Sequence, residues 1–311
     1  MKALVTGGSG FIGSWLVDKL IENENKVIVV DNLSVGEKNN VNGKAIFYQL
    51  DICDNERLNK IFEKEKPEII FHLAANSLLR KSLEDPIFDA QNNILGTISV
   101  LECCRKNNAR KLIYTSTGGA RVGEPLYLPV DEKHPLHPSS PYGISKHSAE
   151  HYVEMYGKLC GIDYFIFCFG NVYGPRDNPE SKRIIPVFIT KILKNEKPII
   201  FGDGNQTRDF IYVLDLADFL IESIDKLGGT DNKLFHLANG EQISVNKVVE
   251  LLRKISCENF TVEHHEAIKG EVRDIVLDIR LAEKELEWKP KTDIEQGLKE
   301  TWEWFKRNKE T

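Results

Sequence analysis

The stretch Thr6-Gly7-Gly8-Ser9-Gly10-Phe11-Ile12-Gly13 stands between an apolar run at 2–6 and a segment with helical periodicity at 14–22. It satisfies both the Gly-x-Gly-x-x-Gly and the Gly-x-x-Gly-x-x-Gly spacing. Glycines at these spacings allow a tight turn, a close approach of the backbone to a pyrophosphate, and close packing of helix on strand. The free N–H groups at the start of the helix favour phosphates. The motif therefore predicts a dinucleotide site at Gly7, Gly10, Phe11, Ile12 and Gly13.

Apolar runs and helix-like segments alternate through the first half of the chain. Strands are predicted at 2–6, 26–31, 45–49, 69–73, 111–116 and 164–169, and helices at 14–22, 55–65, 86–107 and 142–159. Apolar strands that alternate with helices are typical of a parallel sheet covered on both faces, so we expect an α/β protein with a doubly wound Rossmann sheet. After residue 171 the alternation fades. We place a dinucleotide-binding domain at 1–171 and a smaller mixed α/β substrate domain at 172–311, some segments of which we expect to return to the first domain.

The composition narrows the class of protein. Of 311 residues, 41% are hydrophobic and 28% charged, which is ordinary for a globular cytoplasmic protein. The net charge of −6 argues against a nucleic-acid binder. No signal peptide and no apolar run of ~20 residues is evident, so we expect no membrane partner. The six cysteines include no Cys-x-x-Cys pair and the histidines show no ligand spacing, so we expect reduced thiols and no metal.

The ends of the next strands extend the predicted cofactor site. Asp31 ends the second strand, eighteen residues after Gly13. A carboxylate there accepts hydrogen bonds from the adenosine ribose and repels a 2′-phosphate, so NAD is favoured over NADP. The alternative is that Asp31 only caps the following turn. Asp51-Ile52 and His72-Leu73-Ala74-Ala75 end the third and fourth strands, at the sheet edge where open α/β folds bind ligands.

Tyr142 and Lys146 are the candidate catalytic pair. They open the helix that follows Pro138-Ser139-Ser140-Pro141 and, four residues apart, share one helix face. A nearby ammonium and a positively charged nicotinamide favour phenolate, so we expect the pKa of Tyr142 to fall from ~10 toward neutrality. Tyr142 would then act as a general base, and Lys146 would tune it and hold the nicotinamide ribose. Such a pair is otherwise a common surface feature; its position after a dinucleotide motif favours function.

A hydroxyl group follows the fifth predicted strand in Thr117-Gly118-Gly119. It is placed to hydrogen-bond the same reacting oxygen, or else to cap backbone groups at the strand end. We assign the catalytic role to Thr117, with Ser116 as its substitute.

Together these residues resemble the extended short-chain dehydrogenase/reductase family, in its nucleotide-sugar epimerase branch. The motifs that carry the resemblance are TGGSGFIG at 6–13, DNLS at 31–34, HLAA at 72–75, NNILGT at 92–97, SPYGISK at 140–146, NVYGPR at 171–176, GDG at 202–204, RDFIYV at 208–213 and GE at 270–271. The resemblance implies that Thr117, Tyr142 and Lys146 carry catalysis in an NAD-dependent isomerase.

The resemblance also implies further contacts. It adds to the NAD site Asn32, Leu33, Ser34, Gly36, Asn93, Ser116 and Phe169. It places Asn171 and Arg208 at the nucleotide diphosphate, and Ile184, Ile199 and Phe201 at the uridine. A guanidinium suits this role because it grips phosphate oxygens through two donors. It further implies a homodimer formed through the predicted helices at 86–107 and 142–159.

Three positions depart from the family pattern. Arg121-Val122 replaces an aliphatic-Tyr pair, and Cys168-Phe169 replaces Arg-Tyr. Ile268 stands where an arginine is usual, so one phosphate contact is either missing or supplied by Lys269 or Arg273.

The resemblance implies a 4-epimerase that interconverts UDP-glucose and UDP-galactose. Epimerases or decarboxylases of other UDP-sugars, such as UDP-N-acetylhexosamine or UDP-glucuronate, stay open, and Arg121 would suit a carboxylate. In the related 4,6-dehydratases Asp-Glu follows the threonine. Gly118-Gly119 stands at these positions here, which argues against a dehydratase. A non-catalytic dinucleotide sensor would be expected to lose Tyr142 or Lys146.

Overall fold

The structure is a computed structural model and describes residues 1–230, 233–268 and 272–308. Its main sheet has seven parallel strands in the order β11-β6-β5-β4-β1-β2-β3. The strands are β1 (Lys2–Thr6), β2 (Lys26–Asp31), β3 (Ile46–Gln49), β4 (Ile69–His72), β5 (Lys111–Thr117), β6 (Asp163–Phe169) and β11 (Leu234–Leu237). The first six match the predicted strands to within one residue at each end. The predicted Rossmann fold is confirmed, and β11 is a strand that the sequence analysis did not predict.

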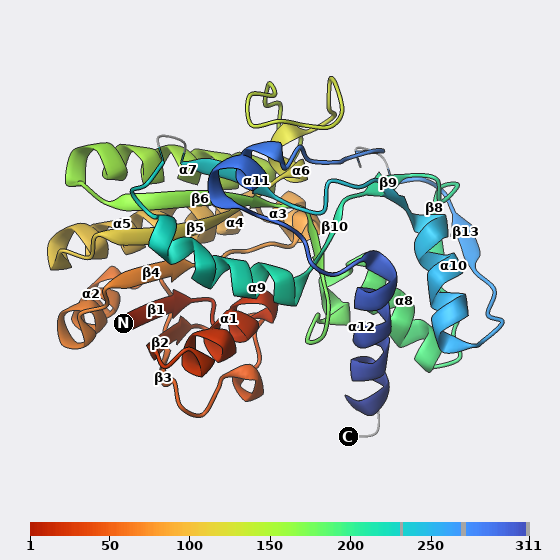
Figure 1. Ribbon diagram of the computed structural model, residues 1–311, viewed down its shortest axis with the longest axis horizontal. Helices are drawn as coiled ribbons and strands as arrows, with labels where there is room; N and C mark the ends of the chain where they lie inside the picture. Colours follow the sequence, from red (N-terminus) through yellow and green to blue (C-terminus); the bar gives the residue numbers. More distant parts are fainter. Residues whose placement is uncertain (231–232, 269–271, 309–311) are drawn as a thin grey trace.

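Helices cover both faces of this sheet (Figure 1). On one face lie α1 (Phe11–Glu22), α9 (Val213–Glu222) and α11 (Arg280–Leu286), and on the other α2 (Asn55–Glu65), α5 (Gly96–Asn107) and α7 (Pro141–Cys160). Alternate strand residues point to opposite faces, so Ala3 and Val5 belong to one core and Leu4 to the other. Burial on both faces explains why the strands are apolar throughout rather than alternating.

A second unit with its own core lies at one end of the main sheet (Figure 1). Its strands form three pairs: β7 (Asn171–Tyr173) with β10 (Phe210–Tyr212), β8 (Ile199–Phe201) with β13 (Glu263–His265), and β9 (Thr207–Arg208) with β12 (Ile243–Ser244). Its helices are α8 (Ile184–Leu193), α10 (Val245–Ser256) and α12 (Ile294–Asn308). Although β11, α9 and α11 follow residue 171, they pack in the first unit. The domain boundary at 171 stays a prediction.

The short helices include α3 (Leu79–Glu84), α4 (Pro86–Ala90), α6 (Gly119–Val122) and 3-10 turns at Lys38–Asn40, Pro179–Ser181 and Ser223–Lys226. The single helix predicted at 86–107 is α4, a π-helical turn (Gln91–Leu95) and α5 in succession. Such turns often occur at functional sites. Within the described residues, no helix is long and apolar enough to cross a membrane.

Candidate active site

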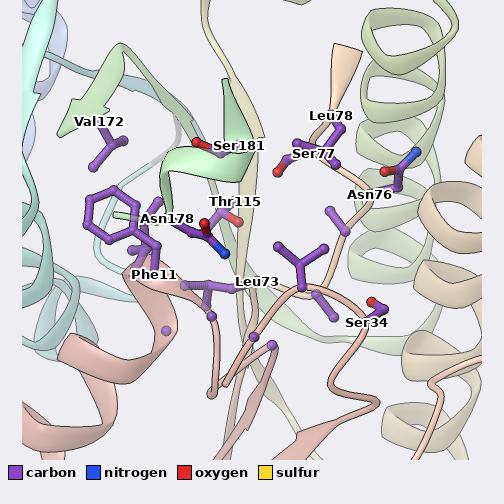
Figure 2. Close-up of a pocket in the computed structure, with 18 of the residues that line it drawn as sticks. Phe11, Ser34, Leu73, Asn76, Ser77, Leu78, Thr115, Val172, Asn178 and Ser181 are labelled. Atoms are coloured by element: carbon purple, nitrogen blue, oxygen red, sulfur yellow. The ribbon is translucent and has the colours of Figure 1, made fainter. Parts of the chain in front are cut away.

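A cleft of about 500 Å³ opens at the carboxyl ends of the main strands. Figure 2 shows Phe11 at the start of α1, Leu73 beyond β4, and Asn178 and Ser181 close above them. The predicted residues that line it are Gly7, Gly10, Phe11, Ile12, Gly13, Asp31, Asn32, Ser34, Gly36, Ile52, Leu73, Ala74, Ala75, Ser116, Thr117, Tyr142, Lys146, Phe169 and Asn171. One cleft therefore brings together the dinucleotide motif and the candidate catalytic side chains.

The glycine motif forms a tight turn at the N-terminus of α1. Gly7 has a φ of 73°, and a Cβ there would lie 2.7 Å from the backbone nitrogen of Ala74. A Cβ on Gly13 would lie 2.2 Å from the carbonyl oxygen of Gly7. Gly10 caps α1 without a side chain, so the first N–H groups of the helix are left for a ligand. This backbone cradle fits the pyrophosphate of a dinucleotide.

Asp31 ends β2 inside the cleft and is 8% exposed. Its Oδ2 accepts a hydrogen bond from the Ser9 amide at 3.0 Å, and its Oδ1 one from the Leu33 amide at 2.8 Å. The carboxylate thus caps the turn, and each oxygen keeps a lone pair that a ribose hydroxyl would use. The turn-capping role of Asp31 is therefore present in the structure. Its contact with the ribose stays a prediction.

Three predicted cofactor residues lie behind the cleft wall instead of on it. Leu33 contributes its amide to Asp31, and Asp51 accepts a hydrogen bond from the Asn32 side chain at 2.9 Å. Burial would raise the pKa of Asp51, but hydrogen bonds from Cys53 and Asn32 lower it overall.

Asn93 is the third, and it lies in the π-helical turn, 1% exposed. Its Oδ1 accepts a hydrogen bond from the Asn76 amide at 2.8 Å, and its amide donates to Ser145 at 3.0 Å. Asn76 lines the cleft and Ser145 lies on α7. The turn therefore positions the loop after β4 against the catalytic helix.

Tyr142, Lys146 and Thr117 meet at one wall of the cleft. α7 begins at Pro141, and the Ser140 side chain caps it by accepting a hydrogen bond from Gly143 N at 3.2 Å. The Thr117 side chain lies close enough to the Tyr142 hydroxyl to oppose the rise of its pKa, and both side chains line the cleft. The Lys146 ammonium lies 4.1 Å from the ring centre of Tyr114. The assignment of Thr117 over Ser116 fits this arrangement, because Ser116 donates its hydroxyl hydrogen bond elsewhere, to Glu150.

The predicted direction of the Tyr142 pKa is wrong for the chain itself. Burial raises the pKa of Tyr142 to about 12, against the opposing effects of the Thr117 hydrogen bond and the positive charge of Arg183. Burial also lowers the pKa of Lys146 to about 7. Burial is the largest cause of both shifts, and sequence spacing alone does not reveal it.

The profile of the family described as "NAD dependent epimerase/dehydratase family" matches residues 3–237. The chain belongs to this family. The predicted resemblance and the predicted cofactor, NAD, are thereby confirmed.

Relatives of this epimerase/dehydratase match almost its whole length. A provisionally named UDP-glucose 4-epimerase of Methanocaldococcus jannaschii is 45% identical over 309 residues, covering 99% of each chain. A UDP-glucuronate 4-epimerase of Thermodesulfobacterium geofontis is 37% identical and covers 98% of this chain and 96% of that protein. The crystal structure of UDP-glucose 4-epimerase with UDP-glucose from Thermotoga maritima has a TM-score of 0.96 at 41% identity, covering 99% of both chains. The predictions of an NAD-dependent isomerase and of a nucleotide-sugar 4-epimerase are confirmed.

In this epimerase/dehydratase the segment 174–183 contributes to the cleft lining, although the sequence motif at 171–176 predicted no role for Arg176 and nothing pointed to residues 177–183. Arg183 lines the cleft, forms a two-pronged ion pair with buried Asp177, and lies 5.2 Å from the Phe11 ring centre. Arg176 pairs with Asp18 of α1 at 2.8 Å. The ring of Trp15 lies 3.9 Å from the Arg176 guanidinium, and its Nε1 donates to the Pro175 carbonyl. Phe11, Trp15 and Asp18 lie on one face of α1, and this pattern is the feature of the sequence that could have predicted these contacts.

Among the described residues, most of the predicted nucleotide-sugar contacts of the epimerase/dehydratase are not part of the lining of this cleft. Arg208 is buried, and its Nη1 donates to the carbonyls of Thr207 and Arg273 at 2.8 and 2.9 Å. The Arg273 side chain pairs with Asp203 at 3.2 Å. Ile184 begins α8, and Ile199 and Phe201 lie on β8. Lys269 lies outside the described residues. The substrate roles of all these residues stay predictions.

The hypothesis that Arg121 favours a substrate carboxylate is wrong. Arg121 is 3% exposed and donates to Glu150 Oε2 at 3.1 Å. Its guanidinium is therefore committed to an internal ion pair outside the lining of the cleft.

Proposed function

We propose that this protein is a UDP-hexose 4-epimerase that interconverts UDP-glucose and UDP-galactose. The neighbouring Tyr142 and Thr117 side chains, with Lys146 one helical turn from Tyr142 in a dinucleotide cleft, carry the proposal. The two relatives named for UDP-glucose, from M. jannaschii and T. maritima, support the choice of sugar.

In this proposal Tyr142 takes the proton from the sugar 4-hydroxyl, and Thr117 holds the same oxygen. Because burial raises the pKa of Tyr142 to about 12, nearby cations must favour its ionised form. Arg183 and the protonated fraction of Lys146 are cations that the cleft lining supplies. NAD, held by the glycine cradle, Asp31 and Lys146, supplies the acceptor for the hydrogen of the sugar carbon and gives it back.

The position after Thr117 argues against a 4,6-dehydratase. A Cβ on Gly118 would lie 2.3 Å from a methyl carbon of Leu277 and 3.0 Å from the Phe169 carbonyl. An acidic side chain at 118 would therefore need the surrounding core to move, and dehydration needs such an acid next to the threonine.

A second candidate is a 4-epimerase of UDP-glucuronate. Arg183 presents a guanidinium at the cleft, and the T. geofontis relative is named for that sugar. Asp177 already neutralises Arg183, which favours the uncharged hexose.

The test is turnover of a panel of nucleotide sugars by the purified protein with NAD. We expect UDP-glucose and UDP-galactose to interconvert, with deuterium placed at C4 retained at C4. Conversion of UDP-glucuronate or UDP-N-acetylglucosamine alone would contradict the choice of sugar. Release of a 4-keto-6-deoxy sugar, or of a decarboxylated sugar, would contradict the reaction class.

A further inference from the structure

A buried ion cluster lies directly beside the catalytic helix residues. Glu150 stands on α7 one helical turn after Lys146 and is 2% exposed. Its carboxylate accepts hydrogen bonds from Arg121 Nη1 at 3.1 Å, Ser116 Oγ at 2.5 Å and His147 Nδ1 at 2.9 Å. Ser116 lines the cleft, so the cluster touches the site through it.

Arg121 depends on Glu150 for its charge compensation. It lies on α6, which follows Thr117, and its Nη1 also reaches Cys168 Sγ at 3.1 Å on β6. Its Nε has no hydrogen-bond partner in the described part of the chain. A buried guanidinium is costly unless it is paired, so the contact with Glu150 is what makes this position tolerable.

The ion pair joins the two segments that carry the candidate catalytic groups. Thr117 lies two residues before the start of α6, and Tyr142 and Lys146 lie in the first two turns of α7. The backbones of the two helices already touch, because a Cβ on Gly143 would lie 2.1 Å from the Ala120 carbonyl oxygen. The Arg121–Glu150 ion pair joins α6 and α7 at a second point, two turns further along α7. The placement of Thr117 beside Tyr142 depends on the relative position of these two helices.

The Arg121–Glu150 ion pair also affects the electrostatic environment of Lys146. Burial would raise the pKa of Glu150, but His147 and Arg121 lower it overall, so Glu150 is ionised. Its negative charge raises the pKa of Lys146 against burial. The titratable groups that face Lys146 from the surrounding elements are Tyr142 and Glu150 on α7, Tyr114 on β5, Cys168 on β6, Asp89 on α4 and His72 on β4.

We propose that Arg121 is a positioning residue of this epimerase: its ion pair with Glu150 holds Thr117 against Tyr142 and balances the carboxylate charge next to Lys146. This inference rests on the proposed roles of Tyr142, Thr117 and Lys146. Arg121 itself touches neither substrate nor cofactor in this arrangement.

The test compares Arg121→Met, Glu150→Gln and the double variant in the full-length protein. Lys146 is titrated by nuclear magnetic resonance of protein labelled at the lysine Cε carbons, with Lys146→Arg to assign the signal. Arg121→Met leaves Glu150 uncompensated and should raise the pKa of Lys146 by on the order of one pH unit. Glu150→Gln should lower it. The double variant should return close to the unchanged protein, and Arg121→Lys should shift least of the single variants.

Kinetics with UDP-galactose supplies the second readout. Misplacement of the reacting groups should lower kcat roughly tenfold to 100-fold in each single variant, with little change in KM, and the double variant should recover part of the loss. Arg280→Met is the matched control, because Arg280 forms a two-pronged pair with Asp278 away from the cleft; it should change neither readout.

An unchanged Lys146 titration in Glu150→Gln would overturn the proposal, as would a double variant whose Lys146 pKa stays as far shifted as in Glu150→Gln, or a loss confined to KM. If Arg121→Met does not fold, the other two variants still decide, because the double variant leaves no charge unpaired and the glutamine side-chain oxygen in Glu150→Gln can still accept a hydrogen bond from Arg121. The titration needs no turnover, so a protein that ignores UDP-galactose would contradict the proposed function and leave the titration result standing.

Discussion

At the scale of single residues, the proposed chemistry depends on Tyr142 and on Thr117 beside it. Tyr142→Phe removes only the ionisable hydroxyl and keeps the ring, so fold and NAD content should be preserved. Loss of a general base costs about 10²–10⁴-fold in rate, and we expect the loss in kcat more than in KM for UDP-galactose. Steady-state kinetics measures it, with Tyr152→Phe, on the exposed part of α7, as control. Near-normal turnover by Tyr142→Phe would contradict the role.

Two buried histidines predict how stability depends on pH. Burial lowers the pKa of His72 to about 3 and that of His236 to about 4. Below ~6.5 the unfolded chain takes up protons at these positions and the folded chain does not, so stability falls as pH falls. Between about pH 6 and 5 the free energy of unfolding should drop by up to about 1.4 kcal/mol per pH unit for each histidine. Urea unfolding measures the slope, and His72→Gln should lower it by the contribution of one histidine; an unchanged slope would disprove the His72 contribution.

At the scale of elements, the segment 174–183 is fastened to α1, the helix that begins at the dinucleotide cradle. Arg176 contributes an ion pair to Asp18 and a stacking contact on Trp15. Arg176→Ala should loosen the segment and speed the loss of NAD, on the order of tenfold, as expected when a charge-assisted contact is removed. The rate of NAD release after dilution measures this. Arg280→Ala removes an ion pair elsewhere in the molecule and should release NAD at the unchanged rate. Equal rates in both variants would contradict the proposed role of Arg176.

At the scale of the whole molecule, the predicted homodimer has a candidate surface on the segment from α4 to α5 and on α7. Ile87 is 71% exposed beside a shallow depression that Leu95 also lines, and Leu159 on α7 is 76% exposed. Covering such side chains is favourable, so we propose that a second copy packs here. Light scattering should give the mass of a dimer, and Ile87→Glu should give a monomer. The control is Leu126→Glu, because Leu126 is an apolar residue of similar exposure in a loop outside this surface; this variant should remain dimeric. A monomeric unchanged protein would contradict the proposal.

The sequence by itself determined the features that depend on local spacing. The glycine motif between strand and helix, the six alternating strands and the pair Tyr142 and Lys146 four residues apart all predict the Rossmann sheet and its cofactor edge. Each follows from backbone geometry over a few residues: a turn that only glycine fits, or a shared helix face. The structure has these features where they were predicted.

Only the tertiary structure decided what depends on burial and on residues far apart in the chain. Arg121 meets Glu150 across 29 positions, Trp15 meets Pro175 across 160, and β11 adds a strand from the second half. The direction of the Tyr142 pKa reversed for the same reason. Proximity of Lys146 is visible in the sequence, whereas removal of the phenol from water is a property of the packed helix and sheet around it.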